Sequence, residues 1–408
     1  MLSYARFSEK SLSLCRYLVI ITAIAAPIST AVSSIASIGL LITWLLSGTS
    51  IQTLKISFQN PVGQVILLFV VWLLIGALYA DTEWPVKITT LLSWKKQFFI
   101  FILLGIFYQE QWQRRFVVYY VIAMTIAGIA ALLCWALQLN IRAGATGPGI
   151  IMTNHSTQSI AFVAAFLCCI FLVRQVQHTT HKYYVLAAGL LFLFNIFFIS
   201  TARSGYLALP PAAFFACVYL YGYKRLPQIL LTLLGIVLIA ALSSATLRDR
   251  FTMALNEQNT YQSSSYETSV GIRMIFYKNT VELIKEKPIL GYGTSSFEKT
   301  YSALAASKYQ DWRGGRATDP HNQYLFIWLE NGLIGLLLFF AYIVVAIRAG
   351  MHNQPYGPIA SSFLVAICAS SLFNSHFKTF AEGNLLAFFL GTLLAFFPSA
   401  SRSDGEHA

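Results

Sequence analysis

Charged residues are scarce in this 408-residue chain: Lys, Arg, Asp and Glu together make up 11% of it, against 57% hydrophobic residues. A soluble globular domain has about 25% charged residues, so an ordinary soluble fold is excluded. The apolar residues form long continuous runs and do not alternate with polar ones, which favours membrane-spanning helices over a barrel. The composition therefore predicts an all-α, polytopic membrane protein.

Cysteine and acidic clusters are also lacking in the hydrophilic stretches. The six cysteines all lie in or beside apolar runs, so neither a disulfide framework nor a zinc site is expected. The outer loops have no Asp-x-Asp pair of the kind that would hold Mg²⁺ or Mn²⁺. Neither a phosphate-binding P-loop nor a dinucleotide fingerprint occurs. We predict that the protein uses no metal and no cofactor.

The net charge of +12 would suggest nucleic acid as a partner of a soluble protein. Here most basic residues stand singly in short connections between apolar runs, where they orient the chain in a membrane. We therefore expect membrane lipids and no nucleic acid as partners. With both termini in the cytoplasm, the short inner connections hold these basic residues: Lys55, Arg114, Arg115, Arg174, Lys182, Lys224, Arg225 and Arg348.

The apolar runs predict about twelve transmembrane helices, each long enough for a hydrocarbon core about 30 Å thick. They are expected at about 17–30, 33–48, 63–80, 95–108, 116–137, 156–174, 183–200, 204–222, 227–245, 323–349, 358–374 and 384–398. Around Pro27 the sequence fits either a tight turn or a kinked helix. The outer connections are then 81–94, 138–155, 200–204, 245–322 and 375–383.

We predict one integrated domain in three parts. Residues 1–245 form transmembrane helices 1–9, residues 246–322 a helical periplasmic loop with catalytic residues, and residues 323–408 helices 10–12 with a short cytoplasmic tail. In the loop, a stripe of apolar residues at helical spacing predicts a helix over 272–287 that leaves Arg273 and Tyr277 on another face. A second helix is expected to begin at Ser295, which with Glu298 fits a capping box.

The end of this loop, Thr318–Tyr324, is the most conspicuous boundary in the sequence. Asp319 suits the N-cap of the tenth span and Pro320 its first helical position, which would place His321 in the first turn. The partial positive charge of a helix N-terminus disfavours an imidazolium ion. The sequence thus predicts a neutral His321 that is able to accept a proton.

Arg203 and Arg273 are expected on the same membrane face as His321. Taken singly, each has a simpler explanation: Arg203 can snorkel from a helix end, Arg273 can be a solvated surface residue, and His321 can hydrogen-bond a loop carbonyl. Together they suggest a reaction, because guanidinium groups match phosphate oxygens and a neutral imidazole can deprotonate a hydroxyl. That reaction is attack by an alcohol on a carbon bonded to a diphosphate leaving group.

We expect further residues on the same face to bind substrate. The basic ones are Lys95 and Lys96 at the start of the fourth span and Arg142 in the Gly-rich loop 142–149, for which interfacial anchoring is an equally good explanation. The others are Asn154, Tyr277 and Asn322.

Three ordered motifs resemble the O-antigen ligase family. They are the run Ser200–Gly205, then Val270–Arg273 followed by Pro288–Gly293, then His321–Leu325 with Glu330–Gly335. The family also includes Wzy-type polymerases and bacterial O-linked protein oligosaccharyltransferases. The resemblance covers about residues 140–340 and is specific for the superfamily, not for one of its branches.

The resemblance implies a metal-independent glycosyltransferase of the bacterial inner membrane, with its active site facing the periplasm. Its donor would be a glycan linked to undecaprenyl diphosphate, and its acceptor a sugar hydroxyl of the lipid A–core, giving complete lipopolysaccharide. In-line attack by the acceptor hydroxyl would make the transfer inverting. By matched position, His321 resembles the general base, Arg203 and Arg273 the arginines that hold the diphosphate, and Lys95 or Lys96 a basic residue of that span. No acidic role is carried over to the stretch with Asn374, His376 and Lys378.

Three other functions fit the same features. A polymerase would use a second lipid-linked glycan as acceptor, and a protein oligosaccharyltransferase a hydroxyl of a protein. A transporter of lipid-linked glycan would also have about twelve spans, but transporters place charges near the membrane midplane and show repeated halves, and neither is evident here.

Overall fold

The computed structural model describes residues 2–144, 147–200, 202–244, 248–249, 252–253, 255–257, 268–352 and 355–395. Thr201, most of the predicted loop between 245 and 267 and the predicted cytoplasmic tail lie outside these residues. All regular secondary structure in the described part is helical, so the all-α prediction is confirmed.

The first half of the chain contributes nine α-helices and one π-helical turn: α1 (Leu2–Ala25), α2 (Thr30–Leu46), α3 (Ser50–Gln59), α4 (Pro61–Tyr79), α5 (Trp84–Ser93), α6 (Lys95–Ile106), α7 (Glu110–Ala136), α8 (His155–Gln175), α9 (Thr179–Phe194) and η1 (Asn195–Ile199). The remainder contributes α10 (Arg203–Tyr221), η2 (Tyr223–Arg225), α11 (Leu226–Ser243), α13 (Ser269–Glu286), α14 (Phe297–Lys308), η3 (Trp312–Gly314), α15 (Gln323–Met351), α16 (Gly357–Ser370) and α17 (Phe380–Leu393).

Eight helices of the described chain are long and apolar enough to cross a membrane, counting α5–α6, α9–η1 and η2–α11 as continuous. The α2–α3 pair would make a ninth span, but it bends by 104°. The apolar helices α16 and α17 have only 14 residues each. These lengths indicate a multi-pass membrane protein, whereas the predicted number of twelve spans is not confirmed.

Two predicted connections are helical. Residues 50–59, expected to be a connection between spans, form α3, and residues 84–93, expected in an outer loop, form α5. The alternatives at Pro27 are resolved in favour of a turn, because α1 ends at Ala25 and α2 begins at Thr30. There the Ser29 side chain accepts a hydrogen bond from Val32 N and caps α2.

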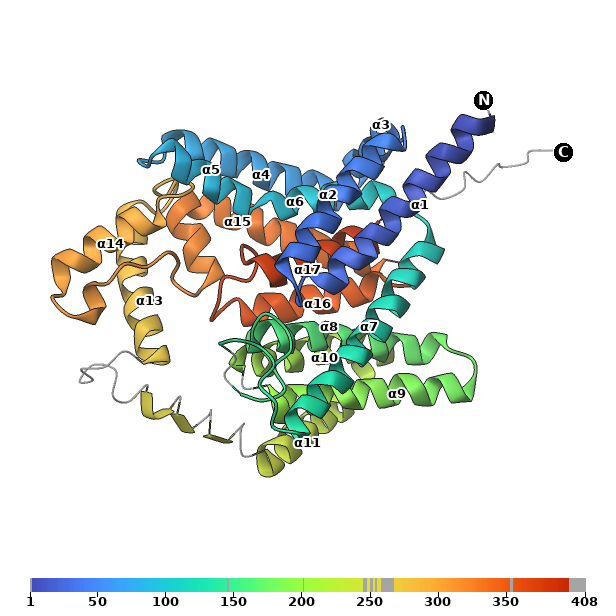
Figure 1. Cartoon of the computed structure of the whole chain (residues 1–408). Coiled ribbons are helices and arrows are strands. Elements are labelled where there is room, and N and C mark those ends of the chain that lie inside the picture. Colours follow the sequence, from blue (N-terminus) through green and yellow to red (C-terminus); the bar gives the residue numbers. More distant parts are fainter. Residues whose placement is uncertain are drawn as a thin grey trace.

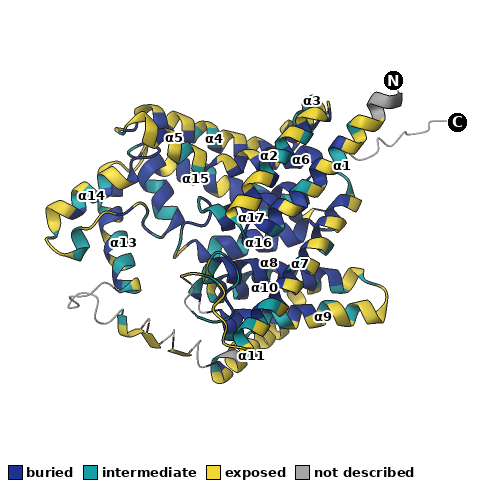
Figure 2. Ribbon diagram, in the orientation of Figure 1, coloured by how far each residue is buried: buried dark blue, intermediate teal, exposed yellow. Residues whose placement is uncertain are grey.

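The helices pack as a bundle around α6, α8, α16 and α17, in each of which most residues are buried (Figure 2). Helix α10 lies against α8 and α16, and α15 lies between α4 and α16. Helices α13 and α14 project from one end of the bundle, and α1 begins at the opposite end (Figure 1). Helices α10 and α11 run across the bundle and back before the segment that contains α13 and α14, and α15 begins after it, so the starts of α10 and α15 both belong to the end from which α13 and α14 project.

Helix α15 is broken at Gly332, whose φ of 64° and ψ of −172° are not helical. The turn after α13 fits into this break. Tyr292 N donates to Leu329 O at 2.9 Å, Gly293 N to Glu330 O at 2.7 Å, and Leu333 N to Pro288 O at 2.9 Å. These bonds satisfy backbone groups that the break would leave unpaired at an apolar depth. The two glycine-rich motifs, Pro288–Gly293 and Glu330–Gly335, are therefore one docking contact.

Both helices of the loop begin at residues other than those predicted. Helix α13 begins at Ser269, with Gly271 N donating to the Thr268 side chain at 3.0 Å, and ends at Glu286, so it contains all but the last residue of the predicted 272–287 helix. Helix α14 begins at Phe297, two residues after the predicted cap. Ser295 has a φ of 87°, and its hydroxyl contacts that of Thr82 at 2.6 Å, so it cannot cap the helix.

Candidate active site

His321 lies just before α15 and not in its first turn. The helix begins at Gln323, and Asn322 is its N-cap: the Asn322 side-chain oxygen accepts from Tyr324 N and Leu325 N, both at 3.0 Å. The prediction that Asp319 caps this helix and that Pro320 opens it is therefore wrong. Of the two candidate caps, Asn322 is the one used, because its side chain satisfies two free N–H groups of the first turn.

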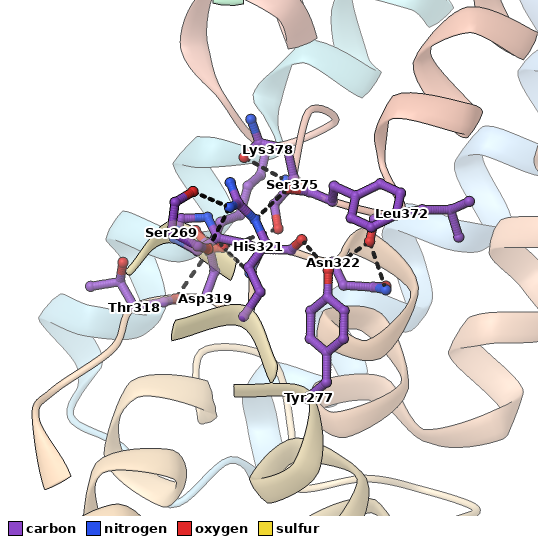
Figure 3. Close-up of polar contacts among 12 residues, drawn as sticks. Ser269, Tyr277, Thr318, Asp319, His321, Asn322, Leu372, Ser375 and Lys378 are labelled. Carbon is purple, nitrogen blue, oxygen red and sulfur yellow. Dashed lines mark hydrogen bonds and ion pairs between the residues drawn. The ribbon is translucent and has the colours of Figure 1, made fainter. Parts of the chain in front are cut away.

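The backbone of His321 adopts a left-handed conformation with a φ of 53°. Such a conformation is uncommon outside glycine and costs about 1–3 kcal/mol unless the surroundings fix it. Two side chains do so here. Asp319 Oδ1 accepts from His321 N at 2.7 Å, and the Tyr277 hydroxyl of α13 donates to His321 O at 3.2 Å. The His321 backbone is thus held by one side chain of its own loop and by one side chain of α13 (Figure 3).

The imidazole of His321 stacks on the ring of Phe276, with the centroids 5.9 Å apart. Its Nδ1 lies 3.5 Å from Asp319 Oδ1, and the side chain remains 40% exposed. Burial lowers the pKa of His321 below its usual 6.5; the Asp319 carboxylate raises it, and the Arg273 cation lowers it. The predicted neutral state is thus favoured by burial and by the Arg273 cation, against the effect of the Asp319 carboxylate, and not by a position inside the helix.

Arg273 projects from α13 and is held firmly. Its Nη1 donates to the backbone oxygen of Ser269 at 2.7 Å and to the hydroxyl of the same residue at 2.6 Å, and its Nε donates to Phe373 O at 3.2 Å. Burial lowers the pKa of its guanidinium, and the nearby Arg203 cation lowers it further. Burial and the Arg203 cation disfavour the charged form of Arg273, so an anion that binds beside the guanidinium stabilises it.

Arg203 is the first residue of α10 and faces the same region. Its Nη2 lies 3.6 Å from Glu257 Oε1, and the second carboxylate oxygen of Glu257 accepts from Val270 N at 2.9 Å. Glu257 therefore bridges the start of α10 to the residue beside the start of α13. The charges of Arg203, Glu257 and Asp319 all act on Arg273.

The structure thus brings Arg203, Arg273, Tyr277, His321 and Asn322 together at one end of the bundle. Asn322 and Tyr277 connect the His321 loop to the segment after α16. The Asn322 amide, besides capping α15, donates to Leu372 O at 3.0 Å, and the Tyr277 hydroxyl also donates to Leu372 O at 2.8 Å. In Figure 3 these bonds join α13, the His321 loop and the segment after α16. Their contacts support the His321 loop, so we assign them a structural role beside any substrate contact.

The predicted lysines differ from each other. Lys95 is exposed, whereas Lys96 is 3% exposed and donates from Nζ to Ser93 O at 2.8 Å and to Lys378 O. Lys96 thereby fixes the loop between α16 and α17, on which Lys378 lies. Its ammonium group contacts backbone carbonyls, not the arginines.

Arg142 and Asn154 are likewise engaged elsewhere. Arg142 Nη1 donates to Ile28 O at 3.1 Å and to Ile151 O at 3.4 Å, which ties its loop to the α1–α2 turn. Asn154 is the N-cap of α8 and accepts from Thr157 N at 2.9 Å. The contacts of both residues are structural.

Sequence reasoning gave no role to Glu257, and it considered Asn374 and Lys378 in a stretch to which no acidic role was carried over. Lys378 lies 3.7 Å from Asp319 Oδ2 through its Nζ, the Asn374 side chain hydrogen-bonds His321, and Glu257 pairs with Arg203. Each is more than 50 positions from its partner, and no periodic pattern links them. The one local signal was the Asp319-x-His321 spacing, which suits a side chain that accepts from the backbone N–H two residues later.

Two guanidinium groups beside a partly exposed imidazole, whose neutral form burial favours, can bind a diphosphate and remove a proton from a hydroxyl. Comparisons with known proteins identify a family for part of the chain. Residues 188–340 match the model of a family described as O-antigen ligase, and this segment contains Arg203, Arg273 and His321. The resemblance noted in the sequence is thereby confirmed, and these residues form a domain of the ligase and polymerase superfamily.

Two curated proteins are similar over shorter stretches. A protein of Haemophilus influenzae without an assigned function is 25% identical over 208 residues, which cover 48% of this chain and 51% of that protein. A protein of Rickettsia conorii that bears the provisional name polysaccharide ligase is 31% identical over 100 residues, which cover 23% of this chain and 24% of that protein. The chain therefore matches about half of the first relative and about a quarter of the second.

Proposed function

Because residues 188–340 carry an O-antigen ligase family domain, we propose that the protein is an O-antigen ligase. It transfers a glycan from undecaprenyl diphosphate to a sugar hydroxyl of the lipid A–core, at the periplasmic face of the bacterial inner membrane. The single observation that carries this proposal is the grouping of Arg203, Arg273 and His321. The Arg203 cation acts on Arg273, and the Arg273 cation acts in turn on His321.

In the proposed reaction, Arg203 and Arg273 hold the diphosphate of the donor, and neutral His321 faces the acceptor hydroxyl. The acceptor oxygen attacks the anomeric carbon while its proton passes to the imidazole. The bond between the anomeric carbon and the diphosphate oxygen breaks, and undecaprenyl diphosphate leaves with the electron pair. In-line attack inverts the anomeric centre. The arginines stabilise the negative charge that grows on the leaving oxygen, which is an electrostatic contribution to the transition state.

The proposal is tested with purified full-length protein in detergent, lipid-linked glycan as donor, and three separate acceptor conditions. Product on lipid A–core supports a ligase. Longer lipid-linked glycan from the donor alone would assign a polymerase, and product on a pilin-like protein would assign a protein oligosaccharyltransferase. Movement of lipid-linked glycan across liposomes without any covalent product would assign a transporter.

The His321→Ala variant tests the proposed base. A general base contributes about 10²–10⁴-fold to a rate, so the variant should lose transfer by that factor while it still binds the donor. The matched control is His352→Ala, because His352 lies at the end of α15 opposite His321 and contacts Arg348 O. Normal turnover by the His321 variant would remove the proposed role.

A further inference from the structure

Asp319 contacts more groups of the candidate site than its position in a loop would suggest. Its Oδ1 accepts from His321 N at 2.7 Å and from the Ser375 hydroxyl at 3.3 Å, and lies 3.5 Å from His321 Nδ1. Its Oδ2 lies 3.7 Å from Lys378 Nζ. The carboxylate is only 18% exposed, so it is enclosed by these partners (Figure 3).

The backbone bond explains why His321 can keep its unusual conformation. A non-glycine residue with a φ of 53° persists only where its surroundings fix it, and such residues are concentrated at active sites. Asp319 supplies the shortest of the two bonds that fix the His321 backbone, the other coming from Tyr277. This backbone conformation fixes the Cα–Cβ direction of His321, and stacking on Phe276 orients the imidazole ring.

The side-chain contact then distinguishes the two ring nitrogens. Nδ1 faces the carboxylate, and a carboxylate beside one nitrogen of a histidine favours the tautomer that carries its proton there. We propose that Asp319 is a positioning residue for His321: it fixes the backbone and Nδ1, which leaves Nε2 to take the proton of the acceptor hydroxyl, and Lys378 holds Asp319 in place. This inference rests on the proposed function.

The charged groups around His321 come from three elements. Asp319 lies on its own loop, Arg273 and the Tyr277 hydroxyl on α13, and Lys378 on the loop between α16 and α17, where Asn374 adds a neutral hydrogen bond. The Asp319 carboxylate raises the pKa of His321, and the Arg273 and Lys378 cations lower it. Removal of the Asp319 charge must therefore lower this pKa, and removal of the Lys378 charge must raise it.

The first experiment measures His321 without relying on turnover. Diethyl pyrocarbonate modifies neutral imidazole, and His321 is exposed enough to react, so mass spectrometry of its peptide against pH gives a midpoint. We expect Asp319→Asn to lower the midpoint and Lys378→Gln to raise it, each by about half a pH unit or more. The control is Asp311→Asn, which removes an equal charge from a carboxylate paired with Arg313. Its midpoint should equal that of the wild type.

The second experiment measures single-turnover transfer against pH. Asp319→Asn keeps an oxygen for His321 N, and we expect about a tenfold lower rate and an acid limb moved to lower pH; Asp319→Ala removes that oxygen too, and we expect about a 10²-fold loss. Lys378→Gln should move the acid limb to higher pH. If Asp319 and Lys378 only supported the fold, their substitution would lower the rate. It would not move the acid limb to lower pH in Asp319→Asn and to higher pH in Lys378→Gln.

The outcomes separate the inference from the proposed function. If His321→Ala is inactive while Asp319→Asn matches the wild type in labelling and in transfer, only the role of Asp319 is overturned. A shifted labelling midpoint with an unchanged transfer rate also overturns it, because positioning must affect turnover. If His321→Ala is fully active, the proposed function loses its base, whatever the labelling shows. Asp319→Asn nearly preserves the shape of the side chain, so poor folding of Asp319→Ala does not decide the result.

Discussion

The two arginines of the candidate site are held very differently. Arg273 donates three hydrogen bonds, to two groups of Ser269 and to Phe373 O, whereas the contact of Arg203 with the described residues is an ion pair with Glu257 at 3.6 Å. The α13–α15 wall of the site, with Arg273 and His321, is thus fixed before a substrate arrives. On the α10 wall, the described residues hold Arg203 less firmly. A fixed group loses less conformational entropy when it binds and contributes more per contact.

The rigidity of the α13–α15 wall has a backbone origin. The turn Pro288–Gly293 enters the break in α15 and exchanges main-chain hydrogen bonds with it. Gly291 and Gly332 make this approach possible, because a Cβ at Gly291 would lie 2.6 Å from Glu330 O, and one at Gly332 only 2.0 Å from Ile289 O. These contacts hold α13, and with it Arg273 and Tyr277, against α15.

Gly332→Ala should have the largest effect, because it removes the contact on which the fixed wall depends. The substitution adds a Cβ at a φ of 64° and against Ile289 O. We expect a loss of about 3 kcal/mol or more in the free energy of unfolding. The thermal unfolding midpoint in detergent measures it. The control is Gly235→Ala in α11, where a Cβ would meet nothing within 4 Å. If both variants have the same unfolding midpoint as the wild type, the docking contact does not stabilise the wall.

Arg273→Ala should lower kcat/KM for the donor by about 10²-fold, because a fixed, partly buried cation gives charge-assisted hydrogen bonds worth about 1.5–3 kcal/mol each. Arg203→Ala should cost about tenfold, since a loosely held guanidinium loses part of its binding energy on ordering. Lysine should replace Arg203 better than Arg273, whose planar fork is engaged on two sides. Equal losses at the two positions would contradict the difference between the walls.

The pH dependence of transfer tests the environment of His321 on the fixed wall. The imidazole acts while neutral, so the rate falls as the pH drops through its pKa. Burial lowers this pKa below 6.5, so transfer should persist below pH 6.5 and then fall about tenfold per pH unit. Initial rates between pH 4.5 and 8, with donor binding measured in parallel, give the acid limb. If the transfer rate already falls above pH 6.5 while donor binding does not, the pKa of His321 is not lowered.

The same contrast explains what the sequence could and could not predict. The apolar runs and the stripe of α13 are local patterns, so most helices and the positions of Arg203 and Arg273 at one end of the bundle were predictable. The start of α15 was not. Asp319 and Asn322 are both good caps three positions apart, and contacts from distant segments decide between them, such as Gln323 N to Ser371 O at 2.9 Å.

Other parts of the site also depend on distant contacts. The approach of Lys378 and Asn374 to His321 joins segments more than 50 positions apart, and no periodicity signals it. The burial of Lys96 beside an exposed Lys95 is a matter of packing at one helix start. Sequence patterns thus predicted the chemical groups of the site, and tertiary contacts determined how each one is oriented.

The smallest effect is expected at Glu257, whose carboxylate pairs with Arg203 when no other anion is bound. A diphosphate must compete with this carboxylate, so Glu257→Gln should lower KM for the donor. Ion pairs of this exposure are worth about 1 kcal/mol or less, which limits the gain to about fivefold. Donor titration at two salt concentrations measures it, with Glu282→Gln, whose partner is Lys308, as the control. A higher KM would show that Glu257 holds Arg203 in place for the donor, and the α10 wall would then be organised like its counterpart.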